Sequence, residues 1–175
     1  MKKFFYMSVL VLMAALTMTS CGSDDDKKGD EPSEPTSKSI SYEASVTFSQ
    51  DMINICDVTM TYKDSDGKSV TETVTSTTWS KKVNVKKLPA VVGAKCDFKL
   101  KNGVQLTKDS YDLVAELNHF VMINGAKKGY DQPYFFVGGK GIKADKIAEY
   151  VPRKTGSAYG YTISADGKVT ATENF

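Results

Sequence analysis

Apolar and polar residues alternate one by one over much of the chain from Ser39 onward. Five stretches carry this pattern: residues 42–48, 56–62, 79–86, 94–101 and 159–163. Because successive side chains of a strand point to opposite faces of a sheet, each stretch predicts a strand with one buried and one exposed face. The sequence therefore predicts a mainly β domain.

Four dipeptides that tolerate positive φ lie between or beside these stretches: Asp66-Gly67, Asn102-Gly103, Asn124-Gly125 and Asp166-Gly167. They predict tight hairpin turns. Residues 120–123 are apolar on both parities, which predicts a central strand covered on both faces. Short antiparallel strands joined by such turns favour a β-sandwich, with a β-barrel as the alternative.

One short helix is predicted near the end of the chain. Ala144, Ile147, Ala148 and Val151 recur at helical spacing, and Pro152 is expected to stop the helix. Two turns of helix are not stable alone in water, so this helix is expected to dock against the sheet.

The first twenty residues have a different pattern. Lys2 and Lys3 precede an uncharged apolar stretch over residues 4–16, which is too short to span about 30 Å of hydrocarbon. Small residues then lead to Cys21. This order is typical of a signal peptide, which predicts cleavage before Cys21 and export from the cytoplasm.

The cysteine at the cleavage position resembles the lipobox of bacterial lipoproteins, although Met18 stands where that family prefers Leu. The resemblance implies a fatty acid such as palmitate on Cys21 and anchoring to a membrane. The alternative is an ordinary signal peptide followed by a cysteine without lipid.

An acidic run, Ser23 to Asp26, directly follows Cys21. It is similar to the export signal of Bacteroidetes surface lipoproteins, and the alternative is a solvated acidic spacer. Together with the rest of the layout, the chain resembles the small surface lipoproteins of Bacteroidetes. That resemblance implies a single Ig-like sandwich on the outer face of the outer membrane.

Three segments follow from these patterns. Residues 1–20 form the signal peptide, residues 21–38 the lipidated cysteine with an acidic linker, and residues 39–175 one domain. Residues 22–37 carry no aliphatic or aromatic side chain beyond prolines, which predicts disorder. The chain has 23 Lys and Arg against 21 Asp and Glu, and loss of Lys2 and Lys3 leaves 21 of each. This balance disfavours nucleic-acid binding.

Two further cysteines, Cys56 and Cys96, share the parity of the apolar residues in their strands. Both are therefore expected to point inward. They either form a disulfide, worth about 4 kcal/mol for a loop of this length, or remain two buried thiols. A catalytic role is disfavoured because a nucleophile needs exposure and a base.

The remaining candidates for chemistry favour no enzyme, metal or cofactor. His119 is the only histidine and lies at the edge of an apolar run, which predicts a packed, hydrogen-bonded side chain. Asp64, Asp66 and Gly67 fit a hairpin better than a calcium loop. The Gly-rich residues 137–143 lack the phosphate-loop spacing and predict a flexible loop before the helix.

Aromatic residues gather in one Gly- and Pro-bounded stretch beside an acid and an amide: Tyr130, Asp131, Gln132, Tyr134, Phe135 and Phe136. They could form a platform for sugars, or they could cap the core, as Trp79 is expected to do. The leading hypothesis is a non-enzymatic, surface-anchored binding or adhesion module for glycan or host protein. The alternative is an accessory subunit of an outer-membrane or pilus-like assembly that uses a free strand edge.

Overall fold

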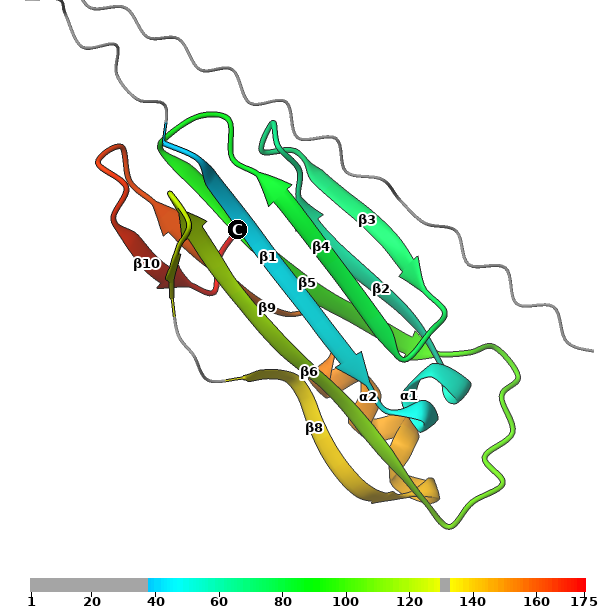
Figure 1. The fold of residues 1–175 in the computed structure, drawn as a ribbon. Helices are drawn as coiled ribbons and strands as arrows, with labels where there is room; N and C mark the ends of the chain where they lie inside the picture. Colours follow the sequence, from blue (N-terminus) through cyan, green and yellow to red (C-terminus); the bar gives the residue numbers. More distant parts are fainter. Residues whose placement is uncertain (1–37, 130–132) are drawn as a thin grey trace, which may run out of the picture. The chain divides into compact units, whose positions relative to one another are not determined.

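Two five-stranded antiparallel sheets form the domain in the computed structural model, which describes residues 38–129 and 133–175 (Figure 1). The predictions for the signal peptide, for lipid on Cys21 and for the acidic linker lie outside the described residues. The two sheets are separate, so the sandwich is confirmed over the barrel.

The first sheet has the strand order β4-β1-β6-β7, and β8 also pairs with β6. Its strands are β1 (Ile40–Phe48), β4 (Thr78–Asn84), β6 (Ser110–Ile123), β7 (Ala126–Lys128) and β8 (Tyr134–Lys143). The second sheet has the order β10-β9-β5-β2-β3. Its strands are β2 (Cys56–Lys63), β3 (Ser69–Val74), β5 (Ala90–Leu100), β9 (Ser157–Ile163) and β10 (Val169–Thr172). The chain crosses between sheets after β1, which differs from the immunoglobulin strand order.

The core lies between the inner faces of the two sheets. Burial alternates along the strands as the sequence predicts, most clearly in β6, where every second residue from Tyr111 to Val121 is buried. Tyr42, Leu113 and Tyr161 are among the largest fully buried side chains. All five alternating stretches are strands, so this part of the prediction is confirmed.

Three of the four predicted hairpin turns are confirmed. The turns at Gly67, Gly125 and Gly167 each have a positive φ and join β2 to β3, β6 to β7 and β9 to β10. Asn102-Gly103 does form a tight turn, with a positive φ at Gly103 and the Val104 N–H donating to the Lys101 carbonyl oxygen at 3.2 Å. The hairpin predicted there is wrong, because the turn lies in the connection from β5 to β6, which are in different sheets.

The stretch 120–123 is central but is not covered on both faces. It lies in β6, between β1 on one side and β7 on the other. Val121 is fully buried, whereas Phe120, Met122 and Ile123 are only partly buried. Among the described residues no further layer packs on the outer face of this sheet. The apolar side chains of this stretch that point outward therefore do not become part of the core.

The predicted helix is present as α2 (Ile147–Lys154), after a 3-10 turn at Ala144–Lys146. Ile147 and Val151 are buried against β5 and β8, so the docking is confirmed. Pro152 lies inside the last turn, and the helix ends two residues later at Lys154.

A second helix, α1 (Gln50–Ile55), was not predicted. Ser49 caps it, since the Ser49 hydroxyl accepts a hydrogen bond from the Met52 backbone N–H at 3.4 Å. Among the described residues, no helix is long and apolar enough to cross a membrane.

Cys56 and Cys96 are not bonded to each other; the structure has two buried free thiols. Both point inward, as the parity predicts, but in the β2–β5 pairing Cys56 lies opposite Leu100 and Cys96 opposite Met60. The four-residue offset separates their backbones by about 13 Å along the strands. A disulfide needs Cα atoms within about 7 Å, so the buried-thiol alternative is the correct one.

Candidate functional site

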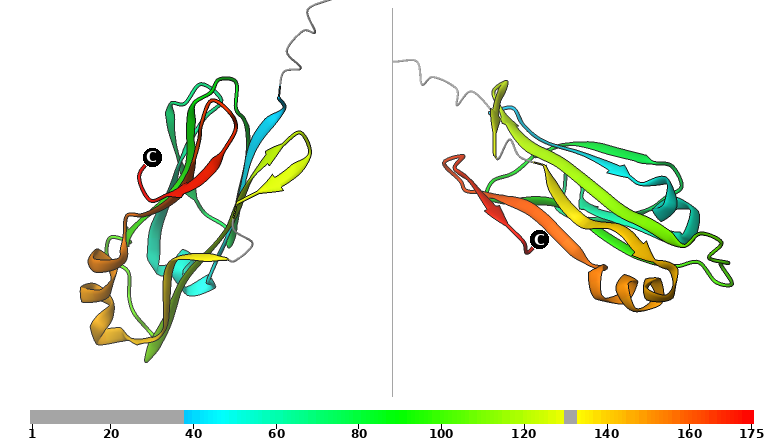
Figure 2. Two further views of the ribbon diagram at one scale, coloured as in Figure 1. Left: turned by 90° about the vertical axis from the view of Figure 1, so that its left-hand side faces the viewer. Right: turned by 90° about the horizontal axis from the view of Figure 1, so that it is seen from below.

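Aromatic rings close the side of the sandwich where β8 of the first sheet runs next to β9 of the second (Figure 2). We call the set His119, Tyr134, Phe136, Tyr159 and Tyr161 the aromatic seam. The ring centroids of Tyr134 and Tyr159 are 4.9 Å apart, and those of Phe136 and Tyr159 are 5.6 Å apart. These spacings are those of favourable aromatic pairs, so the rings join the two sheets at an edge where no backbone pairing does so among the described residues.

His119 holds the inner end of the seam. Its ring lies 4.7 Å from that of Tyr161 and 5.2 Å from that of Tyr134. The Tyr42 hydroxyl is hydrogen-bonded to His119 Nδ1 at 3.1 Å, and the Tyr161 hydroxyl donates to the His119 carbonyl oxygen at 3.2 Å. The prediction of a packed, hydrogen-bonded histidine is therefore confirmed.

Burial determines the charge of these polar groups. It lowers the pKa of His119 to about 4, so the imidazole is neutral near pH 7. It also raises the pKa of Tyr42 well above its usual range, so that hydroxyl keeps its proton. The inner end of the seam thus contributes ring surface and hydrogen bonds without charge.

A pocket of about 310 Å³ opens at the seam. We call it the seam pocket; its lining residues are His119, Tyr134, Tyr159, Gly160, Ala171, Thr172 and Glu173. Tyr134 and Tyr159 are half-buried, whereas Glu173 is exposed. Aromatic walls with a few polar groups are typical of small-ligand sites, and this volume is at the lower end of their range. The seam pocket therefore has the size of one ring-shaped group.

The aromatic stretch of the sequence is divided between the two faces of β8. Phe136 is buried, with 3% of its surface exposed, whereas Phe135 is 47% exposed on the outer face opposite Glu116. Tyr134 lies in the seam pocket, and Tyr130, Asp131 and Gln132 lie outside the described residues. The core interpretation is confirmed for Phe136, and the three rings of 134–136 do not form one continuous patch.

Tyr159 and Glu173 were not predicted as site residues. Tyr159 carried only the alternation of its strand, and Glu173 follows β10 in an exposed segment. These two residues lie near Tyr134 only because of which strands become neighbours in the fold. No single stretch of the sequence carries that information.

The opposite side of the sandwich is closed by a polar and aromatic cluster. Trp79 on β4 is buried, and its Nε1 donates to Glu72 on β3 at 3.1 Å. Glu72 also accepts from the Tyr62 hydroxyl at 3.2 Å and pairs with Lys81 at 2.6 Å. These contacts lower the pKa of Glu72, with the Lys81 hydrogen bond as the largest cause. Trp79 is a core residue, as expected.

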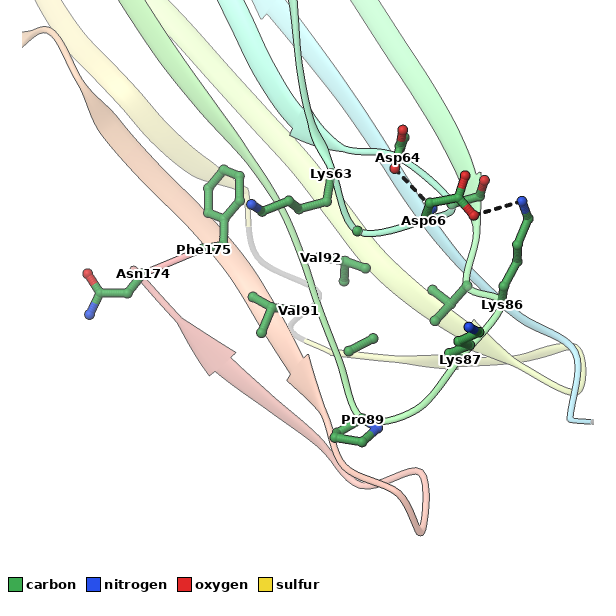
Figure 3. Close-up of a pocket in the computed structure, with 14 residues that line it drawn as sticks. Lys63, Asp64, Asp66, Lys86, Lys87, Pro89, Val91, Val92, Asn174 and Phe175 are labelled. Atoms are coloured by element: carbon green, nitrogen blue, oxygen red, sulfur yellow. Dashed lines mark hydrogen bonds and ion pairs between the residues drawn. The ribbon is translucent and has the colours of Figure 1, made fainter.

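Another pocket, of about 510 Å³, lies at the end of the sandwich (Figure 3). Its walls come from the β2–β3 turn, the β4–β5 connection and the segment after β10. Asp64 belongs to this turn, where its Oδ1 accepts from the backbone N–H groups of Asp66 and Lys68 at 2.9 Å each. These bonds occupy the carboxylate within the hairpin, in agreement with the hairpin interpretation of these residues.

The Gly-rich residues 137–143 form most of β8 and not the flexible loop that was predicted. The reason is packing of α2. A Cβ at Gly139 would collide with the Tyr150 hydroxyl and with Ile142, so a glycine here lets the helix lie close to the strand.

The described residues contain no group of three or more His, Cys, Asp or Glu side chains that could hold a metal ion. No protein-family model matches the chain, and no curated protein or solved structure matches it significantly. The seam pocket presents two tyrosine rings, the His119 imidazole, a threonine hydroxyl and the Glu173 carboxylate.

Proposed function

We propose that this chain is a lipid-anchored binding module on the outer face of the outer membrane, and that the seam pocket binds one sugar ring of a glycan. The seam pocket carries the proposal because it combines the rings of Tyr134 and Tyr159 with the carboxylate of Glu173. The C–H face of a sugar packs on aromatic rings, and its hydroxyls donate to a carboxylate.

A binding role is better supported than a hydrolytic one. His119 is buried and neutral at pH 7, since burial lowers its pKa to about 4. Burial also raises the pKa of Cys56 to about 11 and that of Cys96 to about 12. An enclosed histidine with so low a pKa is a weak general base, and enclosed thiols that keep their protons are poor nucleophiles.

The alternative function, an accessory subunit that adds a partner's strand to a free sheet edge, is less well supported by the edges of the two sheets. β3 and β4 are edge strands of the two sheets and are tied together through Glu72 and Lys81. β10, another edge, has four residues. Short edges and edges carrying lysine are features that oppose strand addition.

The first prediction concerns anchoring of the chain through Cys21. Cys21→Ala should abolish incorporation of a fatty-acid probe in cells, because the acceptor thiol is lost. Cys56→Ala is the matched control and should keep full labelling, since Cys56 is buried in the folded domain. Labelling that persists in Cys21→Ala would contradict the anchor.

The second prediction concerns glycan binding in the seam pocket. Tyr134→Ala and Glu173→Gln should each weaken retention on an immobilised glycan array about tenfold, because each removes a contact worth about 1 kcal/mol or more. Binding to the array, followed by titration with the retained glycan, measures the effect.

Phe135→Ala is the control for this prediction, because it removes a neighbouring exposed ring from the other face of β8. It should leave retention unchanged. A larger loss with Phe135→Ala than with Tyr134→Ala would move the contact site to the outer face. If no glycan is retained by the wild type, the sugar assignment is wrong.

A further inference from the structure

Eight lysines gather at one end of the sandwich, which we call the basic end. They are Lys38, Lys63, Lys68, Lys86, Lys87, Lys127, Lys128 and Lys168. Three aspartates belong to the same segments: Asp64, Asp66 and Asp166. Eight lysines against three aspartates leave a surplus of five positive charges, although the chain as a whole is close to neutral.

These lysines come from five separate segments that the strand pairing brings together (Figure 1). The start of β1 pairs with the end of β6, and the Val85 N–H donates to the Ile40 carbonyl oxygen at 2.8 Å. Lys38 Nζ donates to the Asp166 carbonyl oxygen at 2.8 Å, and Lys86 Nζ lies 3.0 Å from Asp66. The basic end is therefore one surface of the fold.

Several of these lysines are not held in ion pairs within the described part of the chain. Lys38 and Lys63 donate to a carbonyl oxygen and to the Ser69 hydroxyl, which are neutral groups. Lys68, Lys87, Lys128 and Lys168 are exposed and make no ion pair within the described part of the chain. Concentrated, unpaired and exposed lysines produce a local positive potential that attracts anionic partners.

The pocket of about 510 Å³ opens in the basic end. Lys63, Lys86 and Lys87 line it together with Val91 and Phe175 (Figure 3). Val91 is 38% exposed, which is unusual among the apolar residues of this domain. A surface that combines ammonium groups with exposed apolar side chains suits a partner that combines phosphate with hydrocarbon.

We propose that the basic end binds the phosphate-bearing headgroups of the membrane in which the lipid on Cys21 is inserted. This inference rests on the proposed anchoring. Lys38, the first described residue, belongs to the basic end, and only residues 22–37 separate it from Cys21. Each lysine near an anionic lipid surface adds to the attraction, so several lysines acting together reinforce the lipid and orient the domain.

The test uses the chain from residue 21 onward with Cys21→Ser, so that no lipid contributes to binding. At low salt it should bind vesicles containing phosphatidylglycerol and leave vesicles of phosphatidylcholine alone unbound, and salt should release it. Lys68→Glu, Lys87→Glu and Lys168→Glu combined should weaken this binding by about tenfold or more. Vesicle sedimentation measures the bound fraction.

A matched triple variant changes the net charge equally at other places: Lys140→Glu, Lys143→Glu and Lys154→Glu. These lysines are also exposed and lie in or near β8 and α2, away from the basic end. This variant should bind within about twofold of the wild type. Equal losses in both triple variants would overturn the proposal, because net charge alone would then explain binding.

Three further results would also overturn it. The first is absence of binding to phosphatidylglycerol vesicles at low salt. The second is binding that appears only after Asp24→Asn, Asp25→Asn and Asp26→Asn, which would assign the basic end to the acidic run of the same chain. The third is tighter binding to a DNA duplex than to the vesicles. Because the tested chain carries no lipid, failure of the Cys21 labelling experiment would leave these results unaffected.

Discussion

Phe136→Ala is expected to lower the free energy of unfolding by about 3–5 kcal/mol, whereas Phe135→Ala should change it by about 0.5 kcal/mol or less. The two residues are adjacent and chemically identical, but Phe136 is 3% exposed and Phe135 is 47% exposed. Removing the Phe136 ring leaves a cavity beside Tyr159, whose ring centroid lies 5.6 Å away. Urea denaturation followed by tryptophan fluorescence measures both values.

The pair of variants also tests the parity of β8, which follows two shifts in its register with β6. If Phe135→Ala were the more destabilising change, the strand would be displaced by one residue and Tyr134 would leave the seam pocket. Phe136→Leu provides a milder change at the same position and should cost less, because it keeps most of the buried surface. An equal loss for Phe136→Leu and Phe136→Ala would contradict a cavity as the cause.

The strands were predictable because their signal is local. In residues 42–48, for example, the alternation of Tyr42, Ala44 and Val46 with polar neighbours depends on nothing outside that stretch. The turns at Gly67 and Gly167 were predictable for the same reason, since the turn residues and the strands that they join are contiguous.

The errors arose where a local pattern has two structural meanings. Parity correctly placed Cys56 and Cys96 on the inner face, but only the pairing of β2 with β5 fixes how far apart they lie. Asn102-Gly103 has hairpin residues, yet the strands on either side enter different sheets. Glycines 138, 139 and 141 were interpreted as a loop, whereas Gly139 serves close packing of Tyr150 in a strand.

The candidate site was predictable only in part, because it is assembled across elements. Tyr134 was chosen for its aromatic neighbours in sequence, but its partners in the seam pocket come from β6, β9 and the segment after β10. The basic end was even less predictable from the sequence. The balanced total charge disfavours nucleic-acid binding, but it does not reveal a local surplus of lysines. The five segments that concentrate the lysines are brought together only by the fold.

Lowering the pH from 7 to 5 is expected to reduce the free energy of unfolding by about 2 kcal/mol through His119. Burial lowers the pKa of His119 from 6.5 to about 4 in the folded chain. Between these values the unfolded chain binds the proton and the folded chain does not, so protonation favours unfolding. The stability is complete above about pH 6.5 and is lost as the pH falls toward 4. Urea denaturation at a series of pH values measures this slope.

His119→Gln is the control, because an amide can accept a hydrogen bond from Tyr42 but does not titrate. This variant is expected to be less stable at every pH, and the informative quantity is its slope, which should be nearly flat between pH 7 and 5. The carboxyl groups whose pKa values are lowered by hydrogen bonds, such as Asp51 and Glu72, lose their contribution only as the pH falls below about 4.5. The interval from pH 7 to 5 therefore isolates the histidine. If the free energy of unfolding of the wild type depended on pH as little as that of His119→Gln, the imidazole would accept a proton while the chain stays folded. The seam pocket would then carry a positive charge in mild acid in addition to the Glu173 carboxylate.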